Sequence, residues 1–344
     1  MQARPNATVI PGGGTKGAAL RKRRNRLVVV VDGQRNEYAI DDVEQVVLGP
    51  GVSVTTDALL LAAEHGTDVV LTDWRDDPRG RLLTGGLMGA ALTKRNQLAA
   101  MSDRRGVRIA WELARAKCRN QANLLARVDR EAPDPAVTEA VRRIRSALAG
   151  FDPGDAEAVG DVRSAIFAVE GGAGRLYMEA LARLMPEQLG FVGRTRRPPA
   201  DVVNAALSYG YGILHSQVQR GLYLVGLEPA VGFLHTDRWG RSSLTLDVME
   251  IFRQPVIDRA VLTLARRGQL RSDEHAEPHG DGVYLSPPGR RLVAAQVFDR
   301  LNATFTYRGQ AATWKQVIFL EARALASFLL GHRATYHAYT HRWA

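Results

Sequence analysis

Acidic and imidazole side chains occur in three otherwise apolar segments of the sequence. Glu170 precedes three glycines in a helical pattern, and His235 ends an apolar stretch. Asp247 and Glu250 stand three residues apart, so they share one face of a predicted helix. Carboxylate oxygens with one imidazole suit Mg²⁺ or Mn²⁺, and Mn²⁺ tolerates the imidazole better. Because such an ion can neutralise charge on a phosphodiester, the set indicates metal-dependent phosphodiester chemistry.

Each of these segments also has a purely structural explanation. Glycines inside a helix cost roughly 1 kcal/mol each relative to alanine, so they often mark close approach by another backbone or a ligand. A tight helix crossing beside an exposed Glu170 would explain them as well. A lone histidine such as His235 is more often a packing residue than a ligand. Asp247 and Glu250 could also lie on a narrow, water-exposed face of a helix that is otherwise apolar.

Positive charge is in excess along the 344 residues. The formal net charge is +10, and only five of the 46 basic residues are lysines. Codon bias in a GC-rich genome would explain the preference for arginine, but it does not explain the excess of charge. The excess favours a polyanionic partner such as nucleic acid.

Several classes of protein are excluded or disfavoured by the sequence. Cys118 is the only cysteine, which excludes disulfide scaffolds and cysteine-based zinc sites within one chain. Cys118 lies in a helical pattern, where we expect a packing role. There is no run of 18 apolar residues and no signal-peptide layout, so we expect a cytoplasmic protein without a membrane span.

The chain is predicted to be an α+β protein with segregated domains. We expect a basic flexible extension over 1–25, a small β-rich domain over 26–86 and a larger, mainly α-helical domain over 87–344. Predicted strands cover 27–31, 37–40, 45–48, 69–71, 80–83 and 283–285, with a short helix at 57–65. Predicted longer helices cover 91–128, 136–149, 155–185, 201–225, 244–267 and 312–330, because apolar residues recur there with a helical period.

Three further features of the sequence contain residue types that could form a site. His275, Glu277 and His279 lie in an acidic loop that we expect to be solvated. His337 and His341 are four apart near the terminus, where a frayed end is expected. Trp239, close to His235, is either a base-stacking residue or a lid over the site.

Read in order, these segments resemble the CRISPR-associated protein One family, the integrase-nuclease of spacer acquisition. The motifs are Lys117-Cys-Arg-Asn120-Gln121, Glu170-Gly-x-x-Gly-x-x-Tyr177, Pro198-Pro-Ala-Asp-x-x-Asn204-Ala-x-x-x-Tyr209-Gly-Tyr211, Gly232-Phe-Leu-His235 and Arg241-x-Ser243-Leu-x-x-Asp247-x-x-Glu250-x-Phe-Arg253-x-Pro255-x-x-Asp258. The likeness runs from about Arg26 to the C-terminus. One departure is the first 25 residues, which are longer and more basic than the family pattern and lack an obvious opening strand.

The resemblance implies a function and a set of site residues. Members are homodimers, here through the β-rich domain, that assemble on a small ferredoxin-like partner, CRISPR-associated protein Two. They insert spacers into a CRISPR array by attack of a 3′-hydroxyl on repeat DNA. By position, the Mg²⁺ or Mn²⁺ ligands would be Glu170, His235 and Glu250. Asp247 matches a nearby second acid that ranks below Glu250, and Asn204 a polar residue beside the metal.

Tyr177 shares a helical face with Glu170, seven residues away, and is a candidate supporting residue. Two other functions fit the same observations. A non-catalytic DNA-binding scaffold would explain the charge and the helices, but it would not need the three ligand candidates to converge. Another metal-dependent phosphodiesterase, acting on RNA or nucleotides, would use the same ligands.

Overall fold

The computed structural model describes residues 7–9, 18–31, 33–73, 78–82, 90–195, 198–236 and 238–343. The chain divides into two compact units, Met1–Met88 and Gly89–Ala344, each with its own hydrophobic core. The first unit is rich in strands and the second is mainly helical. The predicted α+β class with segregated domains is therefore confirmed.

The first unit contains two four-stranded sheets. Its elements are β1 (Ala7–Val9), β2 (Ala19–Arg23), β3 (Arg26–Val31), β4 (Gln34–Ala39), η1 (Ile40–Asp42), β5 (Val43–Leu48), β6 (Ser53–Val54), α1 (Thr56–Glu64), β7 (Asp68–Thr72) and β8 (Pro78–Leu82). One sheet has the order β4-β3-β2-β6, and the other has the order β1-β5-β7-β8 with only β8 antiparallel. Leu20, Leu27, Val46 and Leu61 are among the residues of their shared core.

The prediction of a flexible extension over 1–25 is wrong for residues 7–9, which form β1 and pair with β5, and for residues 18–23. Strand β2 pairs antiparallel with β3, and a two-residue turn at Arg24 and Asn25 joins them. Only the first part of β2 is buried, and its last three residues are exposed and basic. The strand therefore lacks an alternating apolar pattern, and hairpin hydrogen bonds with the burial of Leu20 place it. Residues 1–6 and 10–17 of the predicted extension lie outside the described residues.

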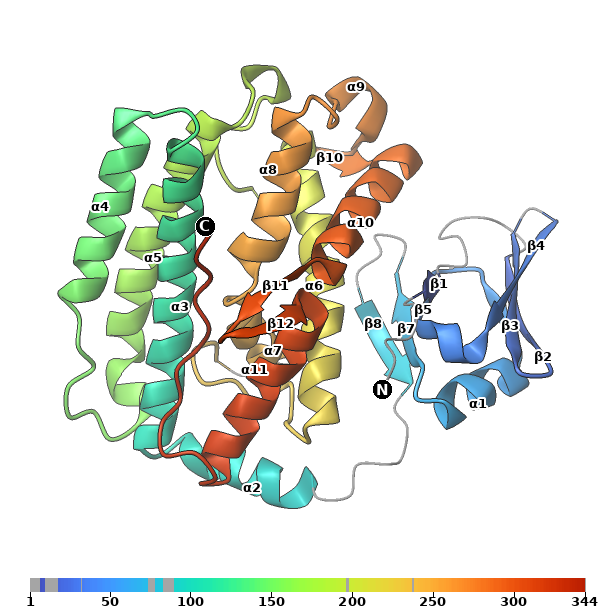
Figure 1. Ribbon diagram of the computed structural model, residues 1–344, viewed down its shortest axis with the longest axis horizontal. Coiled ribbons are helices and arrows are strands. Elements are labelled where there is room, and N and C mark those ends of the chain that lie inside the picture. Colours follow the sequence, from blue (N-terminus) through green and yellow to red (C-terminus); the bar gives the residue numbers. More distant parts are fainter. Residues whose placement is uncertain are drawn as a thin grey trace. The chain divides into compact units, whose positions relative to one another are not determined.

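The second unit is built from helices with two small hairpins (Figure 1). The elements are α2 (Ala90–Ala100), α3 (Arg104–Asp129), α4 (Pro135–Ala149), α5 (Val159–Leu184), η2 (Glu187–Leu189), α6 (Val202–Leu224), α7 (Ser243–Met249), the π-helical stretch η3 (Arg253–Asp258), α8 (Arg259–Arg266), α9 (Ser272–His275), β9 (Ala276–His279), β10 (Gly282–Leu285), α10 (Pro287–Asn302), β11 (Thr304–Tyr307), β12 (Gln310–Thr313) and α11 (Trp314–Leu329). Helices α3, α4 and α5 pack together, and α6 packs against α10 and α11.

Two long predicted helices are each interrupted. The helix predicted over 91–128 is two helices, because the Asp103 carboxylate caps α3 by accepting the Arg105 amide at 2.8 Å. The helix predicted over 244–267 becomes α7, the stretch η3 containing Pro255, and α8. Proline has no amide hydrogen, so a regular helix cannot continue through it unchanged.

Some elements were missed or misplaced by the sequence. Helix α10 was not predicted, although its buried residues Val293, Val297 and Leu301 are spaced by four. Hairpin β11–β12 includes residues assigned to the last predicted helix. None of the described helices is long and apolar enough to cross a membrane.

The predicted frayed C-terminal end is wrong for the described residues after α11. This segment runs along α3 (Figure 1). The backbone amide of His341 donates to Asn120 at 2.8 Å, and its carbonyl accepts from Asn123 at 2.8 Å. His341 is consequently buried, and the segment is part of the helical unit.

Candidate active site

Glu170 and Glu250 meet at one lysine. Glu170 lies in the middle of α5, and Glu250 directly follows α7. The ammonium of Lys117, on α3, donates to Glu170 Oε1 and lies 2.9 Å from Glu250 Oε2. The side chains of the two acids are only 17% and 5% exposed. The fold therefore brings two predicted ligands, far apart in sequence, to a single buried cation.

Both acids and the lysine are placed by regular helices. Helix α3 buries an apolar stripe against α4 and α5, and Lys117 is a polar position beside that stripe. Asn120, one turn further along α3, donates to the carbonyl of Ile251 at 2.8 Å. This bond ties the chain just after Glu250 to α3, so the carboxylate is held near Lys117.

Neighbouring cations keep Glu250 ionised. Burial alone would raise its pKa, but Arg253 and Lys117 outweigh burial and hold the pKa of Glu250 at about 2. Burial would likewise lower the pKa of Lys117, yet Glu250 and Glu170 raise it above its ordinary value. Arg253 Nε lies 3.1 Å from Glu250 Oε2. The group is thus a buried cluster of full charges.

His235 is oriented by Asp247. The carboxylate of Asp247 is fully buried and accepts the backbone amides of Phe233, Leu234 and His235 at 2.6 to 2.9 Å. Its Oδ1 also lies 2.6 Å from His235 Nδ1. Because an ionised carboxylate can only accept, Nδ1 must carry a proton, so Nε2 is the nitrogen whose lone pair can bind a metal when the imidazole is neutral. Asp247 has no oxygen to spare, so the structure makes it a positioning residue for His235.

The loop before His235 depends on Gly232. A Cβ at this glycine would lie 2.7 Å from Ser243 Cβ and 2.9 Å from the carbonyl oxygen of His235. The chain can therefore fold tightly over the start of α7 only with glycine here. The imidazole packs edge-on against Phe167 of α5, with ring centroids 6.0 Å apart. Phe167 lies one helical turn before Glu170 on α5, so His235 is near the acidic pair. A protonated imidazole would also lower the pKa of Glu250.

Tyr177 belongs to a buried junction behind the acids. Its hydroxyl donates to Asp258 Oδ2 at 2.7 Å, and the hydroxyl of Tyr211 donates to Oδ1 at 2.5 Å. Burial raises the pKa of Asp258 to about 6, although the two tyrosines and Arg253 favour the ionised form. The Arg253 guanidinium lies 4.5 Å from the Tyr211 ring centre. Tyr177 therefore supports the site through Asp258 and Arg253.

The side chain of Asn204 forms its hydrogen bonds with the loop that precedes α6. Its side-chain amide donates to Gly193 and Asp201, and its oxygen accepts from Arg194 and from the Thr195 amide. It is fully buried. The structure thus places Asn204 as the organiser of the chain that enters α6, and its bonds leave no group directed at Glu170 or Glu250.

The three glycines after Glu170 are not required by a neighbouring backbone. A Cβ built at Gly171, Gly172 or Gly174 meets no atom within 4 Å. The tight helix crossing considered from the sequence is therefore wrong at these positions. Gly171 is exposed and Gly172 and Gly174 are half-buried, so open space adjoins each of these positions on α5.

The donor set fits a divalent cation if one side chain moves. Among the described residues, no group of three or more His, Cys, Asp and Glu side chains lies close enough to hold a metal ion. However, two carboxylates already share one positive ion, the Lys117 ammonium, and an imidazole with a free Nε2 lies beside them. Two carboxylates and an imidazole match the ligand preference of Mn²⁺ or Mg²⁺. Withdrawal of Lys117 would open that position.

Sequence reasoning gave no role to Lys117, Arg253 or Asp258. All three occur in the motifs quoted for the family resemblance, but only as part of the pattern. Amino-acid composition was the one feature of the sequence that could have identified Lys117. Lys117 is one of five lysines in a chain that otherwise uses arginine, and it lies in a helix that is mostly buried on that face.

The remaining candidates are separate from this cluster. Cys118 is buried, and burial raises the pKa of its thiol to about 12, which fits the expected packing role. The predicted acidic loop begins with the short helix α9, and His275 within it is buried. Trp239 is fully exposed, so it does not cover the acids as a lid within its own chain.

Comparisons with known proteins identify the family of this chain. A family model described as "CRISPR associated protein Cas1" matches residues 14–298. CRISPR-associated endonuclease Cas1 1 of Archaeoglobus fulgidus is 35% identical over 333 residues, which cover 93% of this chain and 96% of that relative.

Two solved structures share the fold. A casposase bound to integration product has a TM-score of 0.82 at 23% identity, covering 98% of this chain and 94% of that chain. A Cas6-RT-Cas1–Cas2 complex has a TM-score of 0.79 at 21% identity, covering 99% of this chain and 37% of that chain. The family model spans most of the chain, and the archaeal relative aligns over nearly its whole length. This chain therefore belongs to the CRISPR-associated protein Cas1 family, as its motifs predicted.

Proposed function

We propose that this chain is a divalent-metal-dependent DNA endonuclease and integrase that inserts new spacers into a CRISPR array. One observation carries the proposal: Glu170 and Glu250 converge on a single buried cation beside His235, in a member of the Cas1 family. The archaeal relative is named an endonuclease, and the casposase of the same fold is described as bound to integration product.

The proposed ligands are Glu170, Glu250 and the Nε2 atom of His235. Asp247 holds the imidazole with Nδ1 protonated, so that Nε2 is available. When bound, Mg²⁺ or Mn²⁺ would supply Lewis-acid stabilisation of the charge that develops on the phosphodiester. Lys117 must then leave its place between the carboxylates, and its flexible stem allows this.

The proposed reaction is a transesterification of DNA. The 3′-oxygen of incoming DNA forms a bond to the phosphorus of a repeat phosphodiester, and the bridging bond to the leaving 3′-oxygen breaks. That oxygen takes up a proton. With water as the nucleophile, the same site hydrolyses DNA. The reverse reaction, disintegration of branched DNA, uses the same groups.

The proposed partners are DNA, a second copy of the chain and the small protein Cas2. The Cas1–Cas2 complex of the same fold supports the choice of Cas2. Net charge supports DNA: Met1–Met88 contains 11 basic and 11 acidic residues, so the whole excess of +10 lies on residues 89–344. Arginines there would bind the DNA backbone without reading its bases.

A strand-transfer assay tests the proposal. Purified chain, Cas2 and Mn²⁺ are combined with a supercoiled plasmid that carries a repeat and a labelled duplex with free 3′-hydroxyls. We expect label in the plasmid with the wild type, and none with EDTA. Glu170→Gln, Glu250→Gln and His235→Ala should each abolish transfer, whereas the exposed Glu179→Gln on α5 should not.

The outcomes separate the competing functions. Transfer by all of the variants would contradict the proposed site. DNA binding without cutting, joining or disintegration under any metal condition would favour a scaffold. Cleavage of RNA or nucleotides with no action on duplex or branched DNA would favour another phosphodiesterase.

A further inference from the structure

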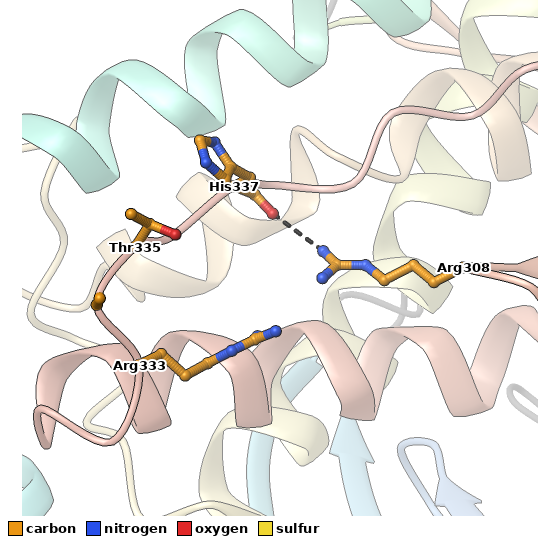
Figure 2. A pocket seen from close by; sticks show the side chains of 5 residues that line it. Arg308, Arg333, Thr335 and His337 are labelled. Carbon is orange, nitrogen blue, oxygen red and sulfur yellow. Dashed lines mark hydrogen bonds between the residues drawn. The ribbon is translucent and has the colours of Figure 1, made fainter.

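A second, basic site lies on the helical unit at the C-terminal segment. A cavity of about 270 Å³ lies between the turn of hairpin β11–β12 and the chain that follows α11, and Figure 2 shows the side chains that line it. It is lined by Arg308, Arg333, Ala334, Thr335 and His337. Neither the ligand candidates nor their supporting residues take part in it.

Arg308 is fixed in place at this cavity. Its guanidinium donates to Glu321 Oε1 at 3.0 Å. It also donates to the carbonyl of His337 at 3.0 Å (Figure 2). Glu321 is buried and also accepts the hydroxyl of Tyr307 at 2.6 Å. The acid that balances Arg308 therefore lies beneath the surface, while 40% of the arginine side chain stays exposed.

Arg333 has no such partner. It is exposed, and among the described residues its guanidinium has neither a hydrogen bond nor an ion pair. Figure 2 shows it extending toward the space in front of Arg308. The hydroxyl of Thr335 likewise has no hydrogen-bond partner in the described part of the chain. One cation and one hydroxyl at the cavity are thus available to a ligand.

The local backbone does not favour arginine at position 308. Arg308 has φ +48° and Gly309 has φ +86°, which is the pattern of a type I′ hairpin turn. The first central position of such a turn prefers asparagine or glycine. The turn therefore carries an arginine against its backbone preference, and that arginine lines the cavity.

Residues of α3 contact His337, which lines the cavity. The Arg108 guanidinium lies 3.3 Å from the ring nitrogens of His337. Glu112 lies 3.3 Å from His337 Nδ1, but its side chain is only 3% exposed and it also pairs with Arg115. The acids near the cavity are consequently buried, and its exposed polar lining consists of guanidinium, hydroxyl and imidazole groups.

We infer that this cavity binds a phosphate of the DNA backbone, an inference that rests on the proposed function. Planar guanidinium groups can donate two hydrogen bonds to phosphate oxygens, and a threonine hydroxyl can add a third. Such a contact positions DNA without reading its sequence. The C-terminal segment is tied to α3, and α3 also carries Lys117. A phosphate held here is therefore fixed to the helix that contributes to the candidate active site.

The salt dependence of DNA binding tests the inference. Fluorescence anisotropy of a labelled duplex with a 3′ overhang is measured from 50 to 200 mM NaCl for the full chain and for Arg333→Ala. Loss of one phosphate contact should flatten the slope of log K against log[salt] by about 0.9. The ratio of wild-type to variant affinity for DNA should therefore be about threefold smaller at 200 mM than at 50 mM NaCl. Arg145→Ala, an exposed arginine on α4, serves as the matched control and should keep the wild-type slope.

Each outcome decides the inference. A flatter slope for Arg333→Ala alone, with an intermediate slope change for Arg333→Lys, supports it. Equal slopes for Arg333→Ala and the wild type overturn it, as does the same change in Arg145→Ala. If inorganic pyrophosphate raises the melting temperature of the wild type but not of Arg333→Ala while the DNA slopes agree, the cavity binds free anions and the DNA assignment is overturned. Strand transfer by the wild type in that case leaves the proposed function intact.

Discussion

At the scale of single residues, the choice of lysine at position 117 is informative. The chain uses arginine at nearly every other basic position, yet Lys117 lies between two carboxylates. Arginine would form a rigid, bidentate ion pair with the carboxylates that is hard to displace. The lysine ammonium is a compact charge on a flexible side chain, so it can move away from the carboxylates. Lysine at this position suits a site that must stabilise two buried acids and still admit another cation.

Lys117→Met should destabilise the metal-free chain strongly. Removing one partner of a buried ion pair leaves an uncompensated charge and costs roughly 3–5 kcal/mol. Lys94→Met is the matched control, because Lys94 pairs with Glu228 at the same 2.9 Å but with side chains 42% and 35% exposed. That loss should stay below about 1 kcal/mol. Urea unfolding in EDTA measures both, and equal losses would mean that Lys117 is not held as a buried charge.

At the scale of elements, the site is held by contacts between helices and loops. Asp258 joins three of them, since it ends η3 and accepts hydroxyls from Tyr177 on α5 and Tyr211 on α6. Arg253, in the same η3 stretch, connects this junction to Glu250. The irregular chain between α7 and α8 is thereby held by side chains of α5 and α6 as well as by α3.

The stability of this junction should depend on pH. Burial raises the pKa of Asp258 from 3.8 to about 6, so the folded state binds its proton more tightly than the unfolded state does. The stabilisation is therefore complete below pH 3.8 and is lost as the pH rises through about 6. Linkage puts the loss on the order of 3 kcal/mol. Asp258→Asn should remove this component from the unfolding free energy measured between pH 4 and 7.

Asp155→Asn is the control for that experiment, because it removes an acidic charge that is fully exposed. Its pH profile of unfolding free energy should follow the wild type. A profile of Asp258→Asn that also follows the wild type would show that Asp258 does not gain a proton on folding. In that case the junction would contain a permanently ionised carboxylate.

Two glycines of the site should respond to alanine in opposite directions. Gly232→Ala places a Cβ against Ser243 and the His235 carbonyl, so the loop must shift and His235 moves with it. We expect lower stability and loss of strand transfer. Gly174→Ala meets open space on α5 and should stabilise the helix by up to about 1 kcal/mol. Thermal unfolding and strand transfer of both variants check this, and a stable, active Gly232→Ala would contradict the role of the loop.

The sequence predicted the elements better than their junctions. Apolar periodicity identified the helices that became α4, α5 and α6, because burial on one face leaves a clear pattern. It could not show that Lys117 would lie between Glu170 and Glu250, since that depends on how α3 packs on its neighbours. Nor did it separate Asp247 from Glu250. The two acids are three residues apart on one helical face. They differ because the Asp247 carboxylate accepts hydrogen bonds from the backbone amides before α7.

At the scale of the whole molecule, charge is divided unequally between the two units. The strand-rich unit is neutral in sum, and residues 89–344 carry 35 basic and 25 acidic residues. The candidate active site and the cavity at Arg308 and Arg333 both belong to this second unit. Net charge therefore favours binding of a polyanion to the unit that contains the candidate active site.

This division predicts how DNA binding responds to salt. If the basic unit contacts six to ten phosphates, affinity should fall by about 10³ to 10⁵ between 50 and 200 mM salt, because bound counterions are released. Arg35→Ala, which removes an exposed charge from the neutral unit, should leave the slope unchanged in anisotropy titrations. A fall of less than about tenfold would mean that only one or two phosphates are bound. The net charge would then reflect solubility rather than recognition of DNA.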